Sequence, residues 1–206
     1  MSKEKVKATE DVILDAAMKV FTRRGFAGAR MEEVAKEAGI NRALLHYYFR
    51  DKETMFNLIF ETRFNEFFSG IARILSSDLP LFEKIRQVIN HEIDTLTSHP
   101  DIPRFVIMEV ASQPERLIQY GQKLGFNPRQ MLTNFTQQVD IAIENKEIIP
   151  IDSRQLLMNV MSTCIYPFVA KPIIKTMMQM DENSFASLME NRKKDLYDFI
   201  LRAITP

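Results

Sequence analysis

Residues 31–49 read MEEVAKEAGINRALLHYYF, and the spacing of the small and apolar residues among them decides the fold of this end of the chain. Ala35 is small, Gly39 follows four residues later, and the apolar Leu45 comes five residues after the apolar Ile40. Two helices that cross steeply over a tight turn need a small residue at the crossing. The turn also needs a left-handed backbone position, which glycine adopts without strain. The spacing therefore predicts a helix-turn-helix whose second helix covers about 42–49.

The second helix of this motif has an inward and an outward side. Leu45 and Phe49 are expected to turn inward, so the opposite side presents hydrogen-bond donors and flat rings that suit phosphates, base edges and thymine methyl groups. The alternative is a solvated polar face on a core helix. The candidate DNA-binding residues are Arg30, Asn41, Arg42, Ala43, Leu44, His46, Tyr47, Tyr48 and Lys52. Of these, we expect Arg42, Ala43, His46 and Tyr47 to read bases, and Arg30, Tyr48 and Lys52 to lie nearer the phosphates.

The segment RDKETMF, residues 50–56, follows this helix. Asp51 is a plausible N-cap for another helix, which places Lys52 in its first turn. A lysine opposes the helix dipole there, so its presence suits a site where a phosphate also binds. The alternative is an ordinary solvated lysine.

The charge distribution divides the chain into two parts. The net charge of the 206 residues is zero. Residues 1–52 carry 11 Lys and Arg against 8 Asp and Glu, a net charge of +3, whereas residues 53–206 carry 16 against 19, a net charge of −3. A basic module joined to a slightly acidic body is typical of nucleic-acid binding proteins. We expect a helix-turn-helix domain over 1–52 and a second domain over 53–206.

Several classes of protein are not supported by the composition. Cys164 is the single cysteine, which excludes an internal disulfide or a cysteine-based zinc site, and it is expected to be a buried small apolar residue rather than a redox sensor. The segment HEID at 91–94 lacks the second histidine of a metalloprotease motif. The polar N-terminus has no signal core, and no apolar run is long enough to span a bilayer. We expect a cytoplasmic protein that is not an enzyme and holds no metal or cofactor.

Apolar residues recur at intervals of three and four nearly everywhere, which predicts an all-α fold of about nine helices. Gly25 and Gly39 stop the first two helices, and Asn127 followed by Pro128 opens the seventh. Pro167 is expected to kink or break the eighth, as is Pro172. The expected helices cover about 9–24, 31–38, 42–49, 52–74, 81–99, 101–113, 127–145, 152–172 and 183–203, with a short helical turn at 116–122.

Residues 13–56 resemble the DNA-binding domain of the TetR family of bacterial transcriptional regulators. The resemblance rests on the motifs Phe21, Gly25-Phe26, Val34-Ala35, Ala38-Gly39-Ile40, Leu45-His46-Tyr47-Tyr48-Phe49 and Lys52-Glu53. The chain departs from the family at two places. Ala29 and Arg30 stand where the family usually has a capping threonine, and His46 stands where it usually has a tyrosine, so no relative's operator sequence applies to this chain.

The resemblance implies that the body encloses a pocket for a small, largely apolar effector and that its last two helices pair with their copies in a homodimer. The alternative for the pocket is an ordinary bundle core, and for the interface it is an apolar stripe consumed by the chain's own core. The candidate pocket residues are Phe64, Phe68, Phe105, Met108, Tyr120, Met131, Phe135, Met161 and Tyr166. The candidate interface stripe on the last helix contains Phe185, Leu188, Met189, Leu196, Phe199 and Ile200.

The sequence and the resemblance together predict a homodimeric transcriptional regulator, a repressor that binds a near-palindromic operator and is released by its effector. A different class of function is a helical adaptor that binds proteins and not DNA. That alternative leaves the basic and aromatic residues at 42–52 unexplained.

Overall fold

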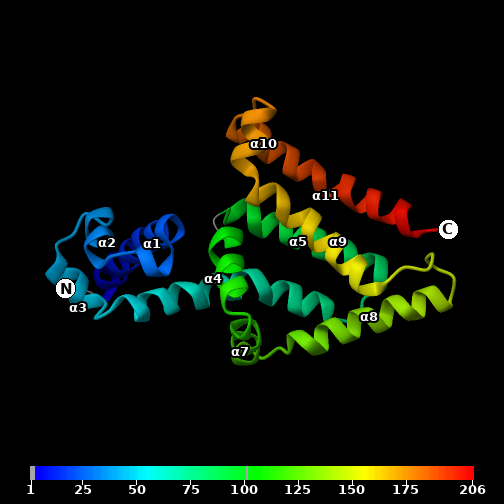
Figure 1. The fold of residues 1–206 in the computed structure, drawn as a ribbon, viewed down its shortest axis with the longest axis horizontal. Helices are drawn as coiled ribbons and strands as arrows, with labels where there is room; N and C mark the ends of the chain where they lie inside the picture. The colour runs from blue at the N-terminus through cyan, green and yellow to red at the C-terminus, as the bar shows by residue number, and fades with distance from the viewer. Residues whose placement is uncertain (1–2, 101) are drawn as a thin grey trace. The chain divides into compact units, whose positions relative to one another are not determined.

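The computed structural model describes residues 3–100 and 102–206, so residue 101, where one helix is expected to begin, lies outside the described part. Within the described part every regular element is a helix (Figure 1), which confirms the all-α class. In chain order the helices are α1 (Lys3–Gly28), α2 (Met31–Glu37), α3 (Arg42–Tyr48), α4 (Lys52–Leu75), α5 (Leu81–Ser98), the π-helix η1 (Pro103–Ile107), α6 (Met108–Ser112), α7 (Glu115–Lys123), α8 (Pro128–Glu144), α9 (Ser153–Val169), α10 (Lys171–Met177) and α11 (Glu182–Ile204).

The helices outnumber the expected nine because two segments are divided and because the short turn expected at 116–122 forms α7. The segment expected as one helix over 101–113 consists of η1 followed by α6. The segment expected over 152–172 consists of α9 and α10, which meet at Ala170. Pro167 is accommodated inside α9, whereas Pro172 lies in the first turn of α10, where a missing backbone N–H costs nothing.

The chain forms two compact units. The first unit contains residues up to Phe64 together with Arg104–Val106, and the second unit contains Asn65–Pro103 and Ile107–Pro206. The first part of α4 therefore belongs to the first unit and its last part to the second.

The core of the first unit is built on aromatic contacts. The ring of Phe56 on α4 lies edge-on to that of Phe21 on α1, with 5.1 Å between centroids, and edge-on to that of Phe105 at 5.3 Å. Phe60, one turn further along α4, lies 6.2 Å from Phe105. All four rings are at most 5% exposed. The residues of η1 at 104–106 thus complete a core whose other members precede residue 65.

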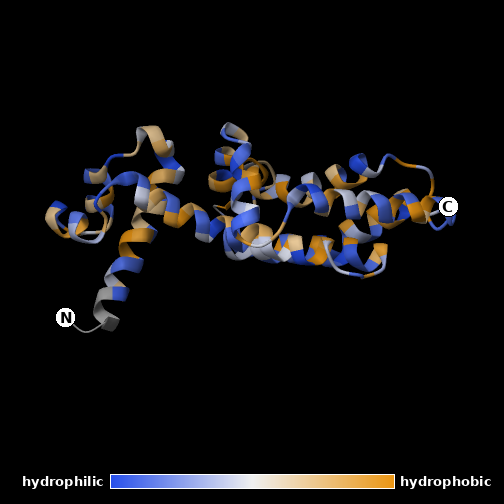
Figure 2. Cartoon of the chain, turned by 90° about the horizontal axis from the view of Figure 1, so that it is seen from below, coloured by the Kyte–Doolittle hydropathy of each residue, from blue (hydrophilic) through white to orange (hydrophobic). Residues whose placement is uncertain are grey.

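In the second unit the helices are amphipathic, and polar and apolar bands alternate along them (Figure 2). The buried side of α5 packs against α9, and α5 also lies along α11. Lys84 on α5 is 3% exposed, and its ammonium donates a 3.2 Å hydrogen bond to the carbonyl of Leu75 at the end of α4. Burial lowers the pKa of this lysine. The bond gives one unpaired carbonyl at the C-terminus of α4 a cationic partner.

Arg192 of α11 compensates for the proline inside α9. Because proline has no backbone N–H, Pro167 cannot donate to the carbonyl of Thr163, four residues earlier. The Nε and Nη2 groups of Arg192 donate to that carbonyl instead, at 3.2 and 2.9 Å. A side chain of α11 therefore replaces the missing hydrogen bond of α9.

Among the described residues, no single helix has both the length and the apolar composition needed to cross a membrane. Among these residues only α9 and α10 taken together have that length and composition, and the two helices are bent by 68° at their junction.

Candidate nucleic-acid interface

The turn between α2 and α3 has the geometry that the sequence predicts. Gly39 has φ = 66°, in the left-handed region, and the backbone N–H of Ile40 donates to the carbonyl of Ala35 at 3.0 Å. The side chain of Asn41 caps α3 by accepting a 2.8 Å hydrogen bond from the backbone N–H of Leu44. Ala35 is 5% exposed at the helix crossing, as expected. This turn fixes the orientation of α3 on α2.

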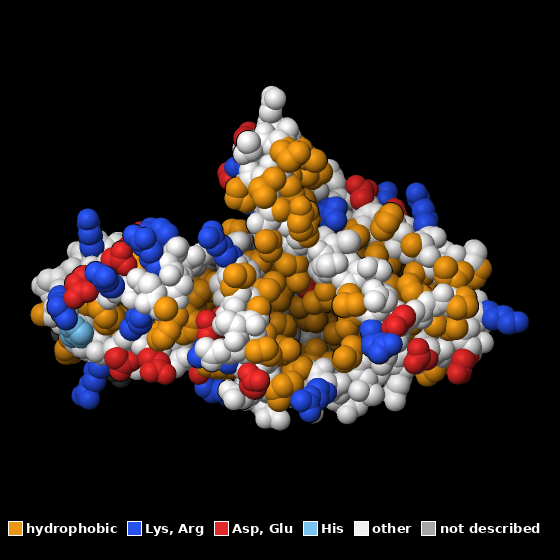
Figure 3. Space-filling view, in the orientation of Figure 1, with side chains coloured by type: hydrophobic (Ala, Val, Ile, Leu, Met, Phe, Trp, Pro, Cys, Tyr) orange, Lys and Arg blue, Asp and Glu red, His pale blue; other side chains and the backbone are white. Residues whose placement is uncertain are grey.

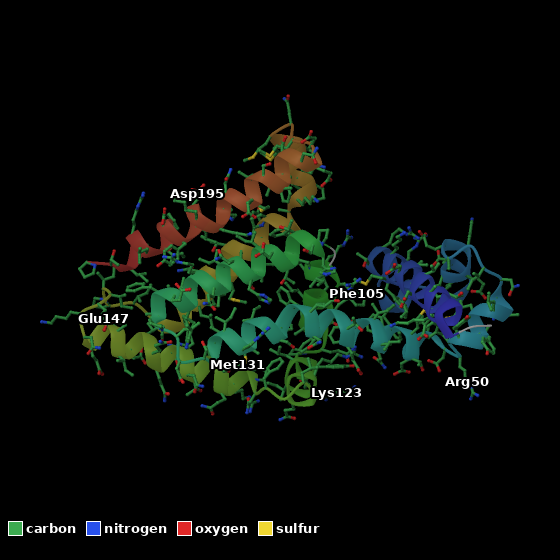
Figure 4. All side chains as sticks on the ribbon, turned by 180° about the vertical axis from the view of Figure 1, so that it is seen from behind. Arg50, Phe105, Lys123, Met131, Glu147 and Asp195 are labelled. Carbon is green, nitrogen blue, oxygen red and sulfur yellow. The ribbon has the colours of Figure 1, made fainter. Side chains whose placement is uncertain are left out.

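Burial defines two sides of α3. Leu45 and Phe49 lie buried at 0% and 4% exposure, as expected for its inward side. Among the candidate DNA-binding residues, Tyr47 is 77% exposed, which is unusual for so large a ring without a partner. The other exposed candidates on and around α3 are Arg30, Asn41, Arg42 and Ala43, and the exposed Arg50 follows the helix (Figure 4). Leu44, His46, Tyr48 and Lys52 are partly buried.

A chain of polar contacts runs along the outward side of α3. An Nη atom of Arg42 forms a 3.0 Å ion pair with Glu32 on α2, and Nε of Arg42 donates to Nε2 of His46 at 3.3 Å. Nδ1 of His46 lies 3.3 Å from the carbonyl of Arg50. If Nε2 accepts from Arg42, the imidazole is neutral and its proton is on Nδ1, where it is donated to the Arg50 carbonyl. Glu32 and His46 thus hold the guanidinium of Arg42 from two sides.

The partner of Arg42 is one of three carboxylates on α2 that pair with arginines. Besides the pair with Glu32, Glu33 lies 3.5 Å from Arg24 of α1 and Glu37 lies 3.2 Å from Arg23 of α1. Sequence reasoning missed these pairs, because the partners are distant along the chain. The acidic composition of residues 32–37 was the sequence feature that could have indicated such ion pairs.

The structure places Lys52 differently from the expectation of a lysine facing only phosphate. Its Nζ donates to the carbonyls of Phe26 at 2.7 Å and Ala29 at 3.2 Å, and it lies 4.5 Å from the centroid of the Phe26 ring. Two of the three ammonium donors therefore hold the end of α1 to the start of α4. Asp51 caps α4 as expected, accepting from the backbone N–H of Thr54 at 2.7 Å, a bond that lowers its pKa.

Two other candidate DNA-binding residues, Arg30 and Tyr48, have few side-chain hydrogen bonds. Arg30 is the N-cap residue of α2, but its side chain makes no capping hydrogen bond, in line with the departure from a capping threonine. The hydroxyl of Tyr48 is buried and has no hydrogen-bond partner among the described residues, and its ring lies edge-on to that of Tyr47 at 5.3 Å. The hydroxyl of Tyr48 is therefore not available at the outward side of α3.

The candidate pocket residues are divided between the two units. Phe64 and Phe105 belong to the first unit, where both are buried. In the second unit Met131 and Phe135 of α8 are buried (Figure 4), whereas Phe68, Tyr120 and Met161 are partly exposed and Met108 and Tyr166 are about two-thirds exposed. Figure 3 shows one face of the second unit hollowed and lined by hydrophobic side chains.

The candidate interface stripe of α11 is mostly buried in its own unit. Phe185, Met189, Leu196 and Ile200 are at most 4% exposed, Leu188 is partly exposed, and Phe199 alone is strongly exposed, at 65%. Strongly exposed large apolar side chains also lie on α9, on α10 and just after α10: Met158, Tyr166, Val169, Ile173, Met177 and Met178. We name these six residues and Phe199 the apolar face.

No group of three or more His, Cys, Asp or Glu side chains in the described part of the chain is arranged to hold a metal ion. Cys164 is fully buried, and burial raises the pKa of its thiol far above the ordinary value. The reactive thiolate is therefore disfavoured at this position.

Residues 13–59 match the model of a protein family described as bacterial regulatory proteins, tetR family. The chain is 30% identical over 101 residues to the HTH-type transcriptional repressor NicS of Pseudomonas putida, an alignment that covers 49% of this chain and 48% of NicS. It is 30% identical over 109 residues to the probable HTH-type transcriptional regulator YttP of Bacillus subtilis, covering 50% and 51%. The chain thus spans about half the length of these curated relatives.

Solved structures match over nearly the whole chain. The ketosteroid transcriptional regulator KstR2 of Mycobacterium tuberculosis has a TM-score of 0.70 at 16% identity, covering 96% of this chain and 95% of that one. A transcription regulator of Marinobacter aquaeolei has a TM-score of 0.62 at 15% identity, covering 98% of both chains. At such identities the match concerns the fold alone.

Proposed function

Because this chain belongs to the TetR family of bacterial regulatory proteins, we propose that it binds a near-palindromic operator in double-stranded DNA as a homodimer and represses transcription until a small molecule releases it. One observation carries the proposal. The helix-turn-helix in the matched region buries Leu45 and leaves a basic and aromatic surface on the outward side of α3. A helix of this kind lies in the major groove, with the side chains near its N-terminus contacting base edges.

In this proposal Arg42, Ala43, His46 and Tyr47 read bases. Arg42 has the planar donors that recognise guanine, and the methyl group of Ala43 suits contact with thymine. Arg30 and the free donor of Lys52 contact phosphates. By function we propose a DNA-binding domain over 1–52 and a ligand-binding and dimerisation domain over 53–206, a division that differs from the compact units, in which residues 53–64 and 104–106 pack with the DNA-binding residues.

The dimer is proposed to form through α9 and α11, with α10 beside them. The support is the apolar face, whose seven residues are 54–79% exposed in the isolated chain. Strongly exposed large apolar side chains in such number favour an interface with a partner. A two-fold axis through this face would give each dimer two copies of α3, and half-sites about 34–36 Å apart, one turn of DNA, would match them.

The proposed mode of action is binding rather than catalysis, in the cytoplasm, where the DNA is. The similar proteins are named as transcriptional regulators. The alternative of a protein-binding adaptor is not favoured, because an adaptor has no need of a helix-turn-helix with a basic outward side. The body is proposed to enclose the effector, and the support is the hydrophobic lining of the hollow in the second unit (Figure 3).

The experiment is selection of DNA by the purified full chain from a random pool, followed by sequencing. We expect enrichment of a sequence with two inverted half-sites about one helical turn apart, bound by a dimer. Enrichment of nothing above the starting pool would reject DNA recognition. Binding of a single half-site by a monomer as tightly as of the full site would reject the dimer.

A pair of variants separates base readout from general attraction. Arg42→Ala is expected to cost about 1–3 kcal/mol at the contacted base pair and to relax the selected sequence there. Arg129→Ala removes an exposed arginine of α8, in the second unit, and should leave the selected sequence unchanged. Equal profiles for the two variants would refute the assignment of Arg42.

A further inference from the structure

The buried side of α5 contains one carboxylate. The stripe of this helix that faces the interior of the second unit consists of Leu81, Ile85, Val88, Glu92 and Leu96, at helical intervals of four and three residues. The four apolar members are at most 5% exposed, and Glu92 is 0% exposed. Its carboxyl group thus projects from the centre of the apolar side of α5 into the interior of the second unit.

Glu92 has no adequate partner there. Both carboxylate oxygens are buried, and neither has a hydrogen-bond partner among the described nitrogen and oxygen atoms. The thiol of Cys164 on α9, a weak donor, lies within hydrogen-bonding reach of this carboxyl group. Burial accordingly raises the pKa of Glu92 to about 8. An uncompensated buried carboxyl costs free energy and calls for an explanation, such as a ligand that the isolated chain lacks.

The preceding residue on α5 carries a third unpaired atom. Nε2 of His91 is buried without a hydrogen-bond partner among the described residues. Its ring packs where α4 has no side chain: a Cβ at Gly70 would lie 2.0 Å from Nε2. Burial and the nearby Arg73 lower the pKa of His91, while Asp94 opposes them. The imidazole is therefore kept neutral at neutral pH. Adjacent positions of α5 thus bring three unpaired polar atoms to the interior.

The kind of ligand follows from the kind of unpaired atom. The two Glu92 oxygens act as acceptors once the carboxyl is ionised, and the thiol of Cys164 supplies one weak donor. An ammonium group has three N–H donors and can serve both oxygens. A ketone could accept only the single proton of a neutral carboxyl and would leave the other oxygen unpaired, and an anion would be repelled by an ionised Glu92. The hydrophobic lining of the hollow in the same unit suits an apolar frame (Figure 3).

We propose that the second unit binds small organic amines with an apolar frame, and that Glu92 is the counter-ion of their ammonium group. The proposal rests on the function proposed above, because it names the chemical class of the effector that releases the DNA. Since Glu92 loses a proton when it pairs with the cation, binding releases a proton below pH 8. Affinity for the amine is then expected to rise by about tenfold per pH unit from pH 6 to 7.

The charged and titratable groups around Glu92 come from three helices. They are His91 on α5 itself, Cys164 on α9 and Arg192 on α11, whose charge acts on the Cys164 thiol. The thiol stays protonated over this range and arginine stays charged, so neither contributes a proton. The variant His91→Gln tests whether His91 rather than Glu92 releases the proton. This variant is expected to keep the pH dependence of the affinity for the amine.

The test uses the full chain and three matched probes, phenethylamine, 2-phenylethanol and phenylacetate, with cyclohexylamine, cyclohexanol and cyclohexanecarboxylate as a second set. Calorimetry in two buffers with different heats of ionisation measures the affinity and the number of protons released. We expect the amines to bind at least tenfold more tightly than the alcohols, with no binding of the carboxylates. The amines, and not the alcohols, should also release the selected DNA.

Variants connect the preference to Glu92. Glu92→Gln keeps the size of the side chain and should lose the preference for amines, the proton release and the effect on DNA. Glu92→Asp keeps the charge and should retain a weaker preference. Glu83→Gln, at the N-terminal end of the same helix, is the matched control and should behave as the unaltered chain does.

The proposal is overturned if no amine of either set binds, if alcohols bind as tightly as amines, or if Glu92→Gln binds amines like the unaltered chain. These outcomes are distinct from failure of the proposed function. A chain that selects no DNA yet binds amines through Glu92 would retain this ligand site and lose the regulatory role.

Discussion

Replacing Arg192 by Met should destabilise the protein, and the loss should shrink when Pro167 is replaced by Ala. In the unaltered chain the carbonyl of Thr163 has no helical donor, and the guanidinium of Arg192 supplies two hydrogen bonds to it. In Pro167→Ala the new backbone N–H at position 167 can donate to the same carbonyl. The carbonyl is then no longer left unpaired when the arginine is removed, so the two substitutions are expected to be coupled.

The magnitude follows from the two bonds, of 3.2 and 2.9 Å. Hydrogen bonds that involve a charged group contribute about 1.5–3 kcal/mol net. Because Arg192 is only partly buried, we take the lower end, about 1.5 kcal/mol, for Arg192→Met in the unaltered chain. In the Pro167→Ala background about 0.5 kcal/mol should remain, since the carbonyl keeps a backbone donor. The expected coupling free energy is therefore about 1 kcal/mol.

The assay is urea unfolding followed by circular dichroism for the four proteins of the cycle, at one fixed protein concentration, since the proposed dimer would make apparent stability depend on concentration. Arg154→Met is the control: Arg154 pairs with Asp152 at the other end of α9, so its effect should add to that of Pro167→Ala. If Arg192→Met and Pro167→Ala add within about 0.3–0.5 kcal/mol, the compensation by Arg192 is refuted.

Three further predictions concern single charged groups. Glu32→Gln removes the ion-pair partner of Arg42 and a negative charge near the proposed DNA site. Binding to random DNA should therefore strengthen, while discrimination at the contacted base pair falls by up to about 1–3 kcal/mol. In the same competition assays the control Glu37→Gln should strengthen binding to random DNA without loss of discrimination. Lys52→Met should lower the free energy of unfolding by about 1–2 kcal/mol in urea, and unchanged stability would mean that its bonds to the α1 carbonyls contribute nothing. The pKa of Glu92 is raised from 4.5 to about 8 in the folded state, which therefore holds a proton that the unfolded state loses. Stability should fall as pH rises between these values, by a few kcal/mol in total, and Glu92→Gln should abolish this fall; a fall of the same size in the variant would contradict it.

The parts of the fold that depend on residues close together along the chain were predictable from the sequence. The turn at Gly39, the cap at Asn41 and the burial of Leu45 follow from a left-handed position, a short polar side chain and helical spacing, and each is confirmed. The π-helix η1 was not predictable, because a wider helical turn has no distinct residue pattern. A break near Pro167 or Pro172 was predicted and is confirmed, but its place at Ala170, between the two prolines, was not, because both prolines fit within helices and leave the position of the bend to tertiary packing.

The parts of the site that depend on distant residues were not predictable. Lys52 bonds to carbonyls 23 and 26 residues earlier in the chain, and no local rule identifies them. The pairing of Arg42 with Glu32 depends likewise on the crossing of two helices. Glu92 was considered only as part of the segment HEID, where a zinc motif was rejected. Its place in the apolar stripe of α5 was visible in the spacing, but its full burial required the packing of α9.

The return of the chain to the first unit limits how its recognition module can be engineered. Phe105 covers the rings of Phe56 and Phe60, although it lies some forty residues beyond the last of the earlier members of that core. A fragment that stops at residue 64 would therefore expose two aromatic faces and would aggregate. A chimaera that joins this first unit to the second unit of another protein therefore has to include the π-helical segment η1. The first unit is therefore not encoded by one continuous segment of the chain.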